Sequence, residues 1–177
     1  MKILVIDDSA IHQAAARKQL ADHDLTVVGS YDEGQALLGK YDFEVVLVDL
    51  LMPASSQSLG RNTHLAGQEM PVGIFLALLA AKNGAKFVAV FTDSDHHSHP
   101  ASACFDAFNK GKYTPLTVEN AKVLLINNPN WVQNDESVPA QEVEQVRLDG
   151  SRHIDKIYPR IKRWDHVLKY LLKSEVA

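Results

Sequence analysis

Residues 44–53 have the sequence Glu44-Val45-Val46-Leu47-Val48-Asp49-Leu50-Leu51-Met52-Pro53. The four apolar residues before Asp49, three of them β-branched, are typical of a strand that is buried on both faces. Pro53 has no backbone N–H to donate, so the strand ends nearby and Asp49 lies at its carboxyl end. Because an unpaired buried charge is costly, a carboxylate in this position indicates a group that is paired with a cation or takes part in a functional site.

A second apolar strand, Lys2–Ile6, ends in a pair of acids, Asp7 and Asp8. In open α/β sheets, ligands and chemistry collect at the carboxyl ends of the strands. If the two strands are neighbours, three carboxylates converge on one crevice. We therefore predict a functional site built from Asp7, Asp8 and Asp49.

Strand and helix patterns alternate along the rest of the chain. We expect strands at 2–6, 25–29, 44–49, 86–92 and 122–127, and helices at about 9–22, 30–40, 72–82, 100–109 and 159–174. This alternation predicts an α/β fold with a doubly wound, five-stranded parallel sheet and helices on both of its faces. In the flavodoxin-like strand order 2-1-3-4-5, the first and third strands are neighbours, which brings the three aspartates together.

Two long irregular segments interrupt this pattern, at about 54–71 and 128–154, within what we expect to be a single domain spanning 1–177. Loops of more than about 15 residues are usually functional or mobile. Residues 138–148 are compatible with a short helix or with a strand. Trp131 is compatible with a partner contact or with a plug over the core.

The composition excludes several classes of protein. The chain has 177 residues, 46% of them hydrophobic, and a net charge of −4, which gives no sign of binding to nucleic acid or to an anionic membrane. Cys104 is the only cysteine, so no disulfide forms within the chain, and we expect it to pack on a helix. The N-terminus lacks a signal-peptide pattern, and the longest apolar run, Val72–Ala81, is too short to span a bilayer. We expect a cytoplasmic protein.

Three motifs resemble the receiver domain of two-component response regulators. They are Ile6-Asp7-Asp8-Ser9, the stretch from Val48 to Pro53, and Val90-Phe91-Thr92. The resemblance covers most of the chain in order, as a stand-alone receiver with the same (β-α)5 topology. It implies that Asp49 accepts a phosphoryl group from a histidine kinase or a histidine phosphotransfer protein, for relay to a downstream protein.

The resemblance also implies a metal site and a switch residue. Mg²⁺ would be bound by Asp8, Asp49 and the main-chain carbonyl of Leu51, with Asp7 acting through water. Mg²⁺ would offset the charge of the transferred phosphoryl group. Thr92 would be the switch hydroxyl that contacts the phosphoryl oxygens.

The chain departs from the family at three positions. Asn128 stands where the family has a lysine, Leu125 where it has an aromatic residue, and Asp93 where it has a small one. These departures keep two hypotheses open: a phosphoaccepting module, and a divergent pseudo-receiver that binds partners without phosphorylation. An aspartate-based phosphohydrolase is a third, disfavoured because no carboxylate lies two residues after Asp49.

Other basic residues are candidates to replace the missing lysine. Lys110, Lys112 or a histidine of the run His96-His97-Ser98-His99 could reach the site, although this histidine spacing is more typical of an exposed loop than of zinc binding. A second basic group is expected on the solvated face of the last helix: Lys156, Arg160, Lys162 and Arg163. The core stripe of that helix is predicted to be Ile161, Trp164, Val167, Leu168, Leu171 and Leu172.

Overall fold

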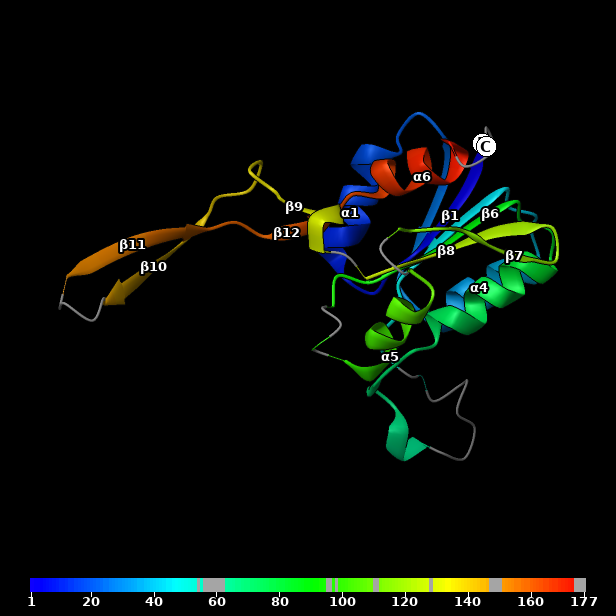
Figure 1. Cartoon of the computed structure of the whole chain (residues 1–177), viewed down its shortest axis with the longest axis horizontal. Helices are drawn as coiled ribbons and strands as arrows, with labels where there is room; N and C mark the ends of the chain where they lie inside the picture. Colours follow the sequence, from blue (N-terminus) through cyan, green and yellow to red (C-terminus); the bar gives the residue numbers. More distant parts are fainter. Residues whose placement is uncertain are drawn as a thin grey trace.

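The structure is a computed structural model that describes residues 1–53, 55, 63–94, 97, 99–109, 112–127, 129–146 and 151–173. These residues form a mixed α/β fold in which a central, mostly parallel sheet is flanked by helices (Figure 1). The sheet has six strands in the order β2-β1-β3-β6-β8-β7.

Five strands of the sheet are parallel and lie within one residue of their predicted bounds. They are β1 (Lys2–Ile6), β2 (Asp24–Val28), β3 (Val45–Val48), β6 (Phe87–Phe91) and β8 (Ala121–Ile126). All four residues of β3 are buried, as their composition predicts. β1 and β3 are neighbours with Ile6 opposite Val48, so Asp7 and Asp49 leave the sheet side by side.

The sixth strand corrects the prediction of a five-stranded sheet. β7 (Leu116–Val118) pairs antiparallel with β8 at the edge of the sheet. Leu116 and Val118 alternate with Thr117, which is a strand pattern, and the turn that follows has Glu119 at a φ of 51°. This short hairpin signal was too brief to be predicted.

Helices cover both faces of the sheet. α1 (Ala10–Gln19) and α6 (Trp164–Lys173) pack on one face, while α2 (Tyr31–Leu38), α4 (Gly73–Lys82) and α5 (Pro100–Ala103) pack on the other. α5 continues as the 3-10 turn η2 (Cys104–Ala107). The residues of β1 alternate between the two cores, as expected for a strand buried on both faces. No helix in the described ranges is long and apolar enough to cross a membrane.

The segments predicted to be irregular contain short elements. The first holds β4 (Met52–Pro53), the 3-10 turn η1 (Thr63–Leu65) and β5 (Glu69–Met70), with β4 antiparallel to β5. The second holds the 3-10 turn η3 (Pro129–Trp131), β9 (Val132–Asn134), β10 (Gln141–Val146) and β11 (Arg152–Ile157). β10 and β11 form a two-stranded ribbon that projects from the body of the molecule (Figure 1). Of the two alternatives for 138–148, the structure has a strand, at Gln141–Val146.

The start of the last helix was predicted wrongly. The helix begins at Trp164 and not near Pro159, and the strand β12 (Arg160–Lys162) precedes it. β12 pairs antiparallel with β9 and lies against α1. Ile161 is buried as predicted, but it belongs to this strand and not to the helix. The predicted stripe holds from Trp164 onward, where Val167, Leu168 and Leu171 are buried.

Trp131 is a core residue, which decides between its two predicted roles. Its side chain is buried, and the centre of its ring lies 4.7–5.3 Å from the ring centres of Tyr113, His166 and Tyr170. This aromatic cluster joins η3 to α6 and closes that end of the core.

Candidate functional site

The carboxyl ends of β1, β3 and β6 border a pocket of about 420 Å³, which we call the acidic pocket. The predicted residues Asp7, Asp8, Asp49, Leu51 and Thr92 all line it. Its other lining residues are Ser9, Ile11, His12, Glu69, Asp93, Ser94 and Lys162. Asp7, Asp49 and Thr92 are buried, whereas Asp8 is exposed. The strand order therefore brings the three predicted aspartates to one pocket.

Lys162 supplies a positive charge in the middle of these acids. Its ammonium nitrogen, Nζ, donates to Asp7 Oδ2 at 2.7 Å and to Asp49 Oδ1 at 2.6 Å. The side chain is fully buried, with Nζ 5.4–5.6 Å from the ring centres of Trp164 and Phe91. The prediction that Lys162 lies on a solvated helix face is wrong, because Lys162 belongs to β12 and points into the pocket.

The backbone N–H and carbonyl of Lys162 both form hydrogen bonds with side chains of α1. The Lys162 N–H donates to His12 Nδ1 at 3.4 Å, and Gln19 Nε2 donates to the Lys162 carbonyl at 3.0 Å. Trp164 Nε1 donates to the His12 carbonyl at 3.0 Å. These contacts dock β12 and the start of α6 on α1, which fixes the direction of the lysine side chain.

His12 links Lys162 to Asp93. Since His12 Nδ1 accepts a hydrogen bond, its Nε2 carries the proton and donates to Asp93 Oδ2 at 3.2 Å. This hydrogen bond, together with attraction to Lys162, lowers the pKa of Asp93 to about 2. The extra negative charge expected at Asp93 is therefore present in the pocket, but it is paired with a histidine that sequence analysis did not single out.

Burial and charge shift the pKa values of the central groups. Burial opposes the charge on Lys162, but attraction to Asp49, Asp7 and Asp93 outweighs it and raises the lysine pKa above its ordinary value. Burial, with repulsion from Asp7, raises the pKa of Asp49 to about 7 despite the attraction of Lys162. One ammonium shared by two buried carboxylates leaves one negative charge uncompensated, which explains why a carboxyl group here holds its proton to a high pH.

Local backbone contacts position the remaining predicted groups. The Thr92 N–H donates to the Ile126 carbonyl, and Thr92 Oγ1 accepts a hydrogen bond from the Ser94 N–H at 3.1 Å. The Thr92 O–H is thus still able to donate. Ser9, which precedes α1, makes no side-chain cap, and its N–H donates to Asp7 Oδ1 at 2.9 Å.

Comparisons of the chain with protein-family models, with curated proteins and with solved structures find no match. The geometry of the acidic pocket is therefore the basis for any statement about function.

Other predicted candidates lie elsewhere. Lys112 and His97 are exposed and do not line the pocket. His99 caps α5, where its Nδ1 accepts a hydrogen bond from the Ala101 N–H at 3.1 Å. Three candidates lie outside the described residues: Lys110, His96 and Asn128.

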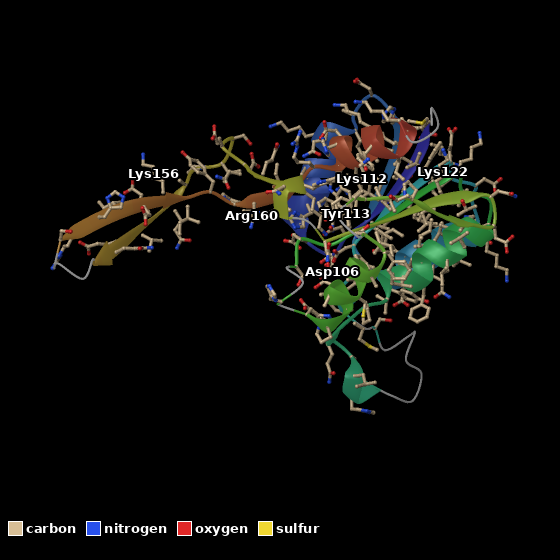
Figure 2. The ribbon with its side chains drawn as sticks, in the orientation of Figure 1. Asp106, Lys112, Tyr113, Lys122, Lys156 and Arg160 are labelled. Carbon is tan, nitrogen blue, oxygen red and sulfur yellow. The ribbon has the colours of Figure 1, made fainter. Side chains whose placement is uncertain are left out.

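The basic run near the C-terminus is spread over several elements. Figure 2 shows Lys156 on the projecting ribbon and Arg160 near its root. Lys162 is the member of this run that lines the acidic pocket. Its role was missed because Arg160-Ile161-Lys162 next to an amphipathic helix has the same composition as one more turn of that helix.

The acidic pocket contains oxygen atoms that can ligate a cation, but they are not arranged as a preformed metal site. Among the residues that the structure describes, no three His, Cys, Asp or Glu side chains are grouped to hold one metal ion. Lys162 Nζ engages one oxygen of Asp7 and one of Asp49. No cation among the described residues pairs with Asp8 at salt-bridge distance, and partial desolvation at the rim of the pocket, with repulsion from Asp7, raises its pKa. Asp8, Asp49 and Leu51, the residues that the receiver resemblance assigns to a divalent cation, all line this pocket.

Proposed function

We propose that this chain is a receiver-type phosphoacceptor whose Asp49 takes a phosphoryl group from a histidine kinase or a histidine phosphotransfer protein. The observation that carries the proposal is the position of Lys162 Nζ between Asp7 and Asp49. Asn128 suggested that the site lacks a compensating cation, whereas Lys162 supports the view that another element provides it. The order of the parallel strands, β2-β1-β3-β6-β8, is compatible with the flavodoxin-like topology of receivers.

The proposed reaction is a transfer between a phosphohistidine and a carboxylate. An Asp49 oxygen attacks phosphorus, the new P–O bond forms as the P–N bond breaks, and the electron pair goes to the imidazole nitrogen of the donor, which takes up a proton from water. Such transfers depend on positioning and charge neutralisation more than on covalent assistance. Asp49 attacks as the carboxylate, so its pKa of about 7 makes the reaction faster above neutral pH.

The residues around Asp49 have separate tasks in this scheme. Lys162 offsets the charge that the phosphoryl oxygens bring, while the Thr92 hydroxyl donates to one of them. Bound Mg²⁺ would add further charge neutralisation, held by Asp8, Asp49 and the Leu51 carbonyl, with Asp7 acting through water. Within the described part of the chain, five carboxylates line the pocket against one lysine, which supports a site with room for a further cation.

A second function, that of a phosphorylation-independent interaction module, is favoured by the projecting ribbon. Ile154 and Ile157 of β11 are 58% and 49% exposed, and their spacing places them on opposite faces of the ribbon. A two-stranded ribbon is marginally stable alone, which favours a partner that covers it. The absence of an aromatic switch residue at Leu125 also favours this alternative.

One experiment separates the two functions. The protein is incubated with Mg²⁺ and acetyl phosphate, or with beryllofluoride, and analysed by intact-mass spectrometry and tryptophan fluorescence. Phosphoacceptance predicts the addition of one phosphoryl group that is lost in Asp49→Asn and kept in Asp42→Asn, an exposed acid that precedes β3. A folded wild-type protein that shows neither labelling nor a metal-dependent response would rule out phosphoacceptance and leave the interaction module.

A further inference from the structure

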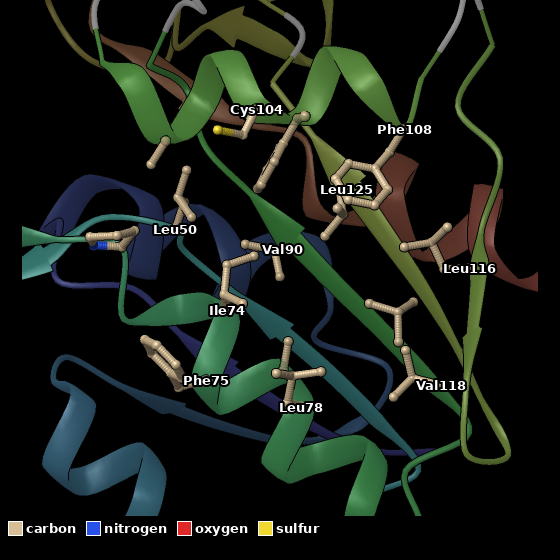
Figure 3. A pocket seen from close by; sticks show the side chains of 15 residues that line it. Leu50, Ile74, Phe75, Leu78, Val90, Cys104, Phe108, Leu116, Val118 and Leu125 are labelled. Atoms are coloured by element: carbon tan, nitrogen blue, oxygen red, sulfur yellow. The ribbon is translucent and has the colours of Figure 1, made fainter.

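A second pocket of about 430 Å³ lies on the opposite face of the sheet from α1 and α6. Figure 3 shows it between α4 and the α5–η2 segment, with strands of the sheet behind. Val90 and Leu125 form part of its floor, and Ile74, Phe105 and Leu116 belong to its walls. Among the residues that the structure describes, all the lining side chains are apolar, and the sulfur of Cys104 is their only heteroatom. We call it the apolar pocket.

The α5–η2 segment beside the apolar pocket is short and spans Pro100–Ala107. Large apolar side chains that line the pocket are exposed to water: Phe75 is 62% exposed, Phe108 49% and Leu78 45%. Cys104, expected to pack on a helix, is exposed at this same place. Water inside such a hollow finds no hydrogen-bonding partners, so its displacement by an apolar group is favourable.

We propose that the apolar pocket binds an uncharged, apolar small molecule. Its volume falls within the range of small-molecule sites, roughly 300–1,000 Å³, which are mostly lined by hydrophobic residues. The lining provides no donor or acceptor side chain except the weakly polar thiol of Cys104, so a charged or strongly polar ligand would lose its hydration without replacement. The sheet floor and the walls on both sides make a hollow that fits a compact ligand better than the flat surface of a protein.

Leu50 connects the apolar pocket with the acidic pocket. Its side chain lines the apolar pocket, and it follows Asp49 directly in the chain. The Gly73 N–H at the start of α4 donates to the Leu50 carbonyl at 3.1 Å. A ligand against Ile74 thus lies on α4, whose first residue, Gly73, is hydrogen-bonded to the segment that carries Asp49. Ligand binding in the apolar pocket does not require phosphorylation of Asp49. Either proposal can therefore be wrong while the other is right.

Cys104 gives a site-specific test, since it is the only cysteine in the chain. The probe is N-phenyl-1-naphthylamine, an uncharged aromatic amine that fluoresces in apolar surroundings. We expect a saturable rise in fluorescence with one probe per chain, and alkylation of Cys104 by iodoacetamide that slows at least tenfold at saturating probe.

Two variants of α5 form a matched pair. Ala101→Phe places a ring in the apolar pocket, whereas Ala103→Phe places it on an exposed position of the same helix outside the lining. We expect Ala101→Phe to weaken probe binding at least tenfold and Ala103→Phe to leave it unchanged. If Ala101→Phe does not fold, Phe108→Asp, at a half-exposed position, replaces it with the same expected loss.

Three results would overturn the proposal. Probe binding that does not saturate would show non-specific adsorption. Equal binding by the pocket variant and Ala103→Phe would place the probe elsewhere. Cys104 protection that rises with protein concentration in the absence of probe, together with a dimer in sedimentation, would show that a second copy of the chain covers the pocket.

Discussion

Lys162 Nζ lies 2.6 Å from Asp49 Oδ1, although 113 residues separate the two in the chain. The same ammonium lies 2.7 Å from Asp7 Oδ2, so one buried cation serves two buried acids. Removal of one partner from a buried ion pair costs more than the pair contributes, because the remaining charge is left without compensation. We therefore expect substitutions of Lys162 and of Asp49 to change the stability of the protein in different ways.

Lys162→Met should destabilise the protein by about 3–5 kcal/mol at pH 8, because it leaves two buried carboxylates without a cation. It should also slow phosphorylation by acetyl phosphate at least tenfold, if the proposed function is correct. Urea unfolding and intact-mass spectrometry measure the two effects. Lys169→Met, which removes an exposed lysine paired with Asp165 on α6, is the control and should cost less than about 1 kcal/mol. Equal costs for the two variants would contradict the importance of the buried cation.

Asp49→Asn should stabilise the protein at pH 8, by about 2 kcal/mol, because Lys162 then has one carboxylate, Asp7, as its partner. In the unfolded chain Asp49 loses its proton near the ordinary aspartate pKa of 3.8, whereas in the folded protein its pKa is about 7. Between these values the unfolded state binds fewer protons, so Asp49 makes the wild type less stable as the pH rises.

The difference between Asp49→Asn and the wild type should therefore be small at pH 5, grow toward pH 7 and level off near pH 8. Urea unfolding across this pH range measures it. A difference that does not change with pH would show that the Asp49 pKa is not raised.

His12→Phe keeps a ring of similar size but removes the acceptor for the Lys162 N–H and the donor to Asp93. We expect a loss of about 1–3 kcal/mol from the unpaired groups. The pKa of Asp93 should rise from about 2 toward its ordinary value. Carboxyl-detected NMR titration measures this pKa.

The pH dependence gives His12→Phe a second readout. Because the folded-state pKa of Asp93 is depressed, its contribution to stability is present above the unfolded-state pKa of 3.8 and is lost as the pH falls toward 2. The variant should lack this acid-dependent loss. His153→Phe on the exposed ribbon is the control, and a similar acid profile in all three proteins would contradict the His12–Asp93 pairing.

Gly73→Ala should destabilise the protein by about 2–3 kcal/mol, since an added Cβ would overlap the Asp49 carbonyl oxygen. The backbone at Asp49 has to move, so phosphorylation should slow as well. Gly39→Ala at the end of α2 is the matched control, because its Cβ would meet ordinary contacts at 3.5 Å or more. Thermal unfolding compares the two, and equal stability would show that α4 is free to shift away from Asp49.

The parallel strands and the aspartate cluster could be predicted because their signals are local. Val45–Val48 and Lys2–Ile6 are short apolar runs, and the topology of a parallel sheet then places the acids after each run on one edge. The bounds of the five parallel strands needed no knowledge of distant contacts.

Lys162, His12 and Glu69 could not be assigned to the pocket from sequence because their roles depend on docking of distant segments. Lys162 reaches Asp7 only after β12 packs on α1, a contact between residues 155 apart in the chain. His12 looks like an ordinary helix residue until Asp93 and Lys162 lie beside it. Residues 160–162 also share the composition of the helix that follows, so nothing local marks them as a strand.

The late position of Lys162 has a consequence for the order in which the molecule is completed. The acids at positions 7 and 49 leave the ribosome long before their counter-ion does, so the edge of the nascent sheet carries excess negative charge until β12 has emerged and docked. A chain that stops short of residue 162 would retain all five parallel strands yet lack the group that neutralises their shared end. The segment that contains β12 thus provides the cation that neutralises the acid at the end of the first strand.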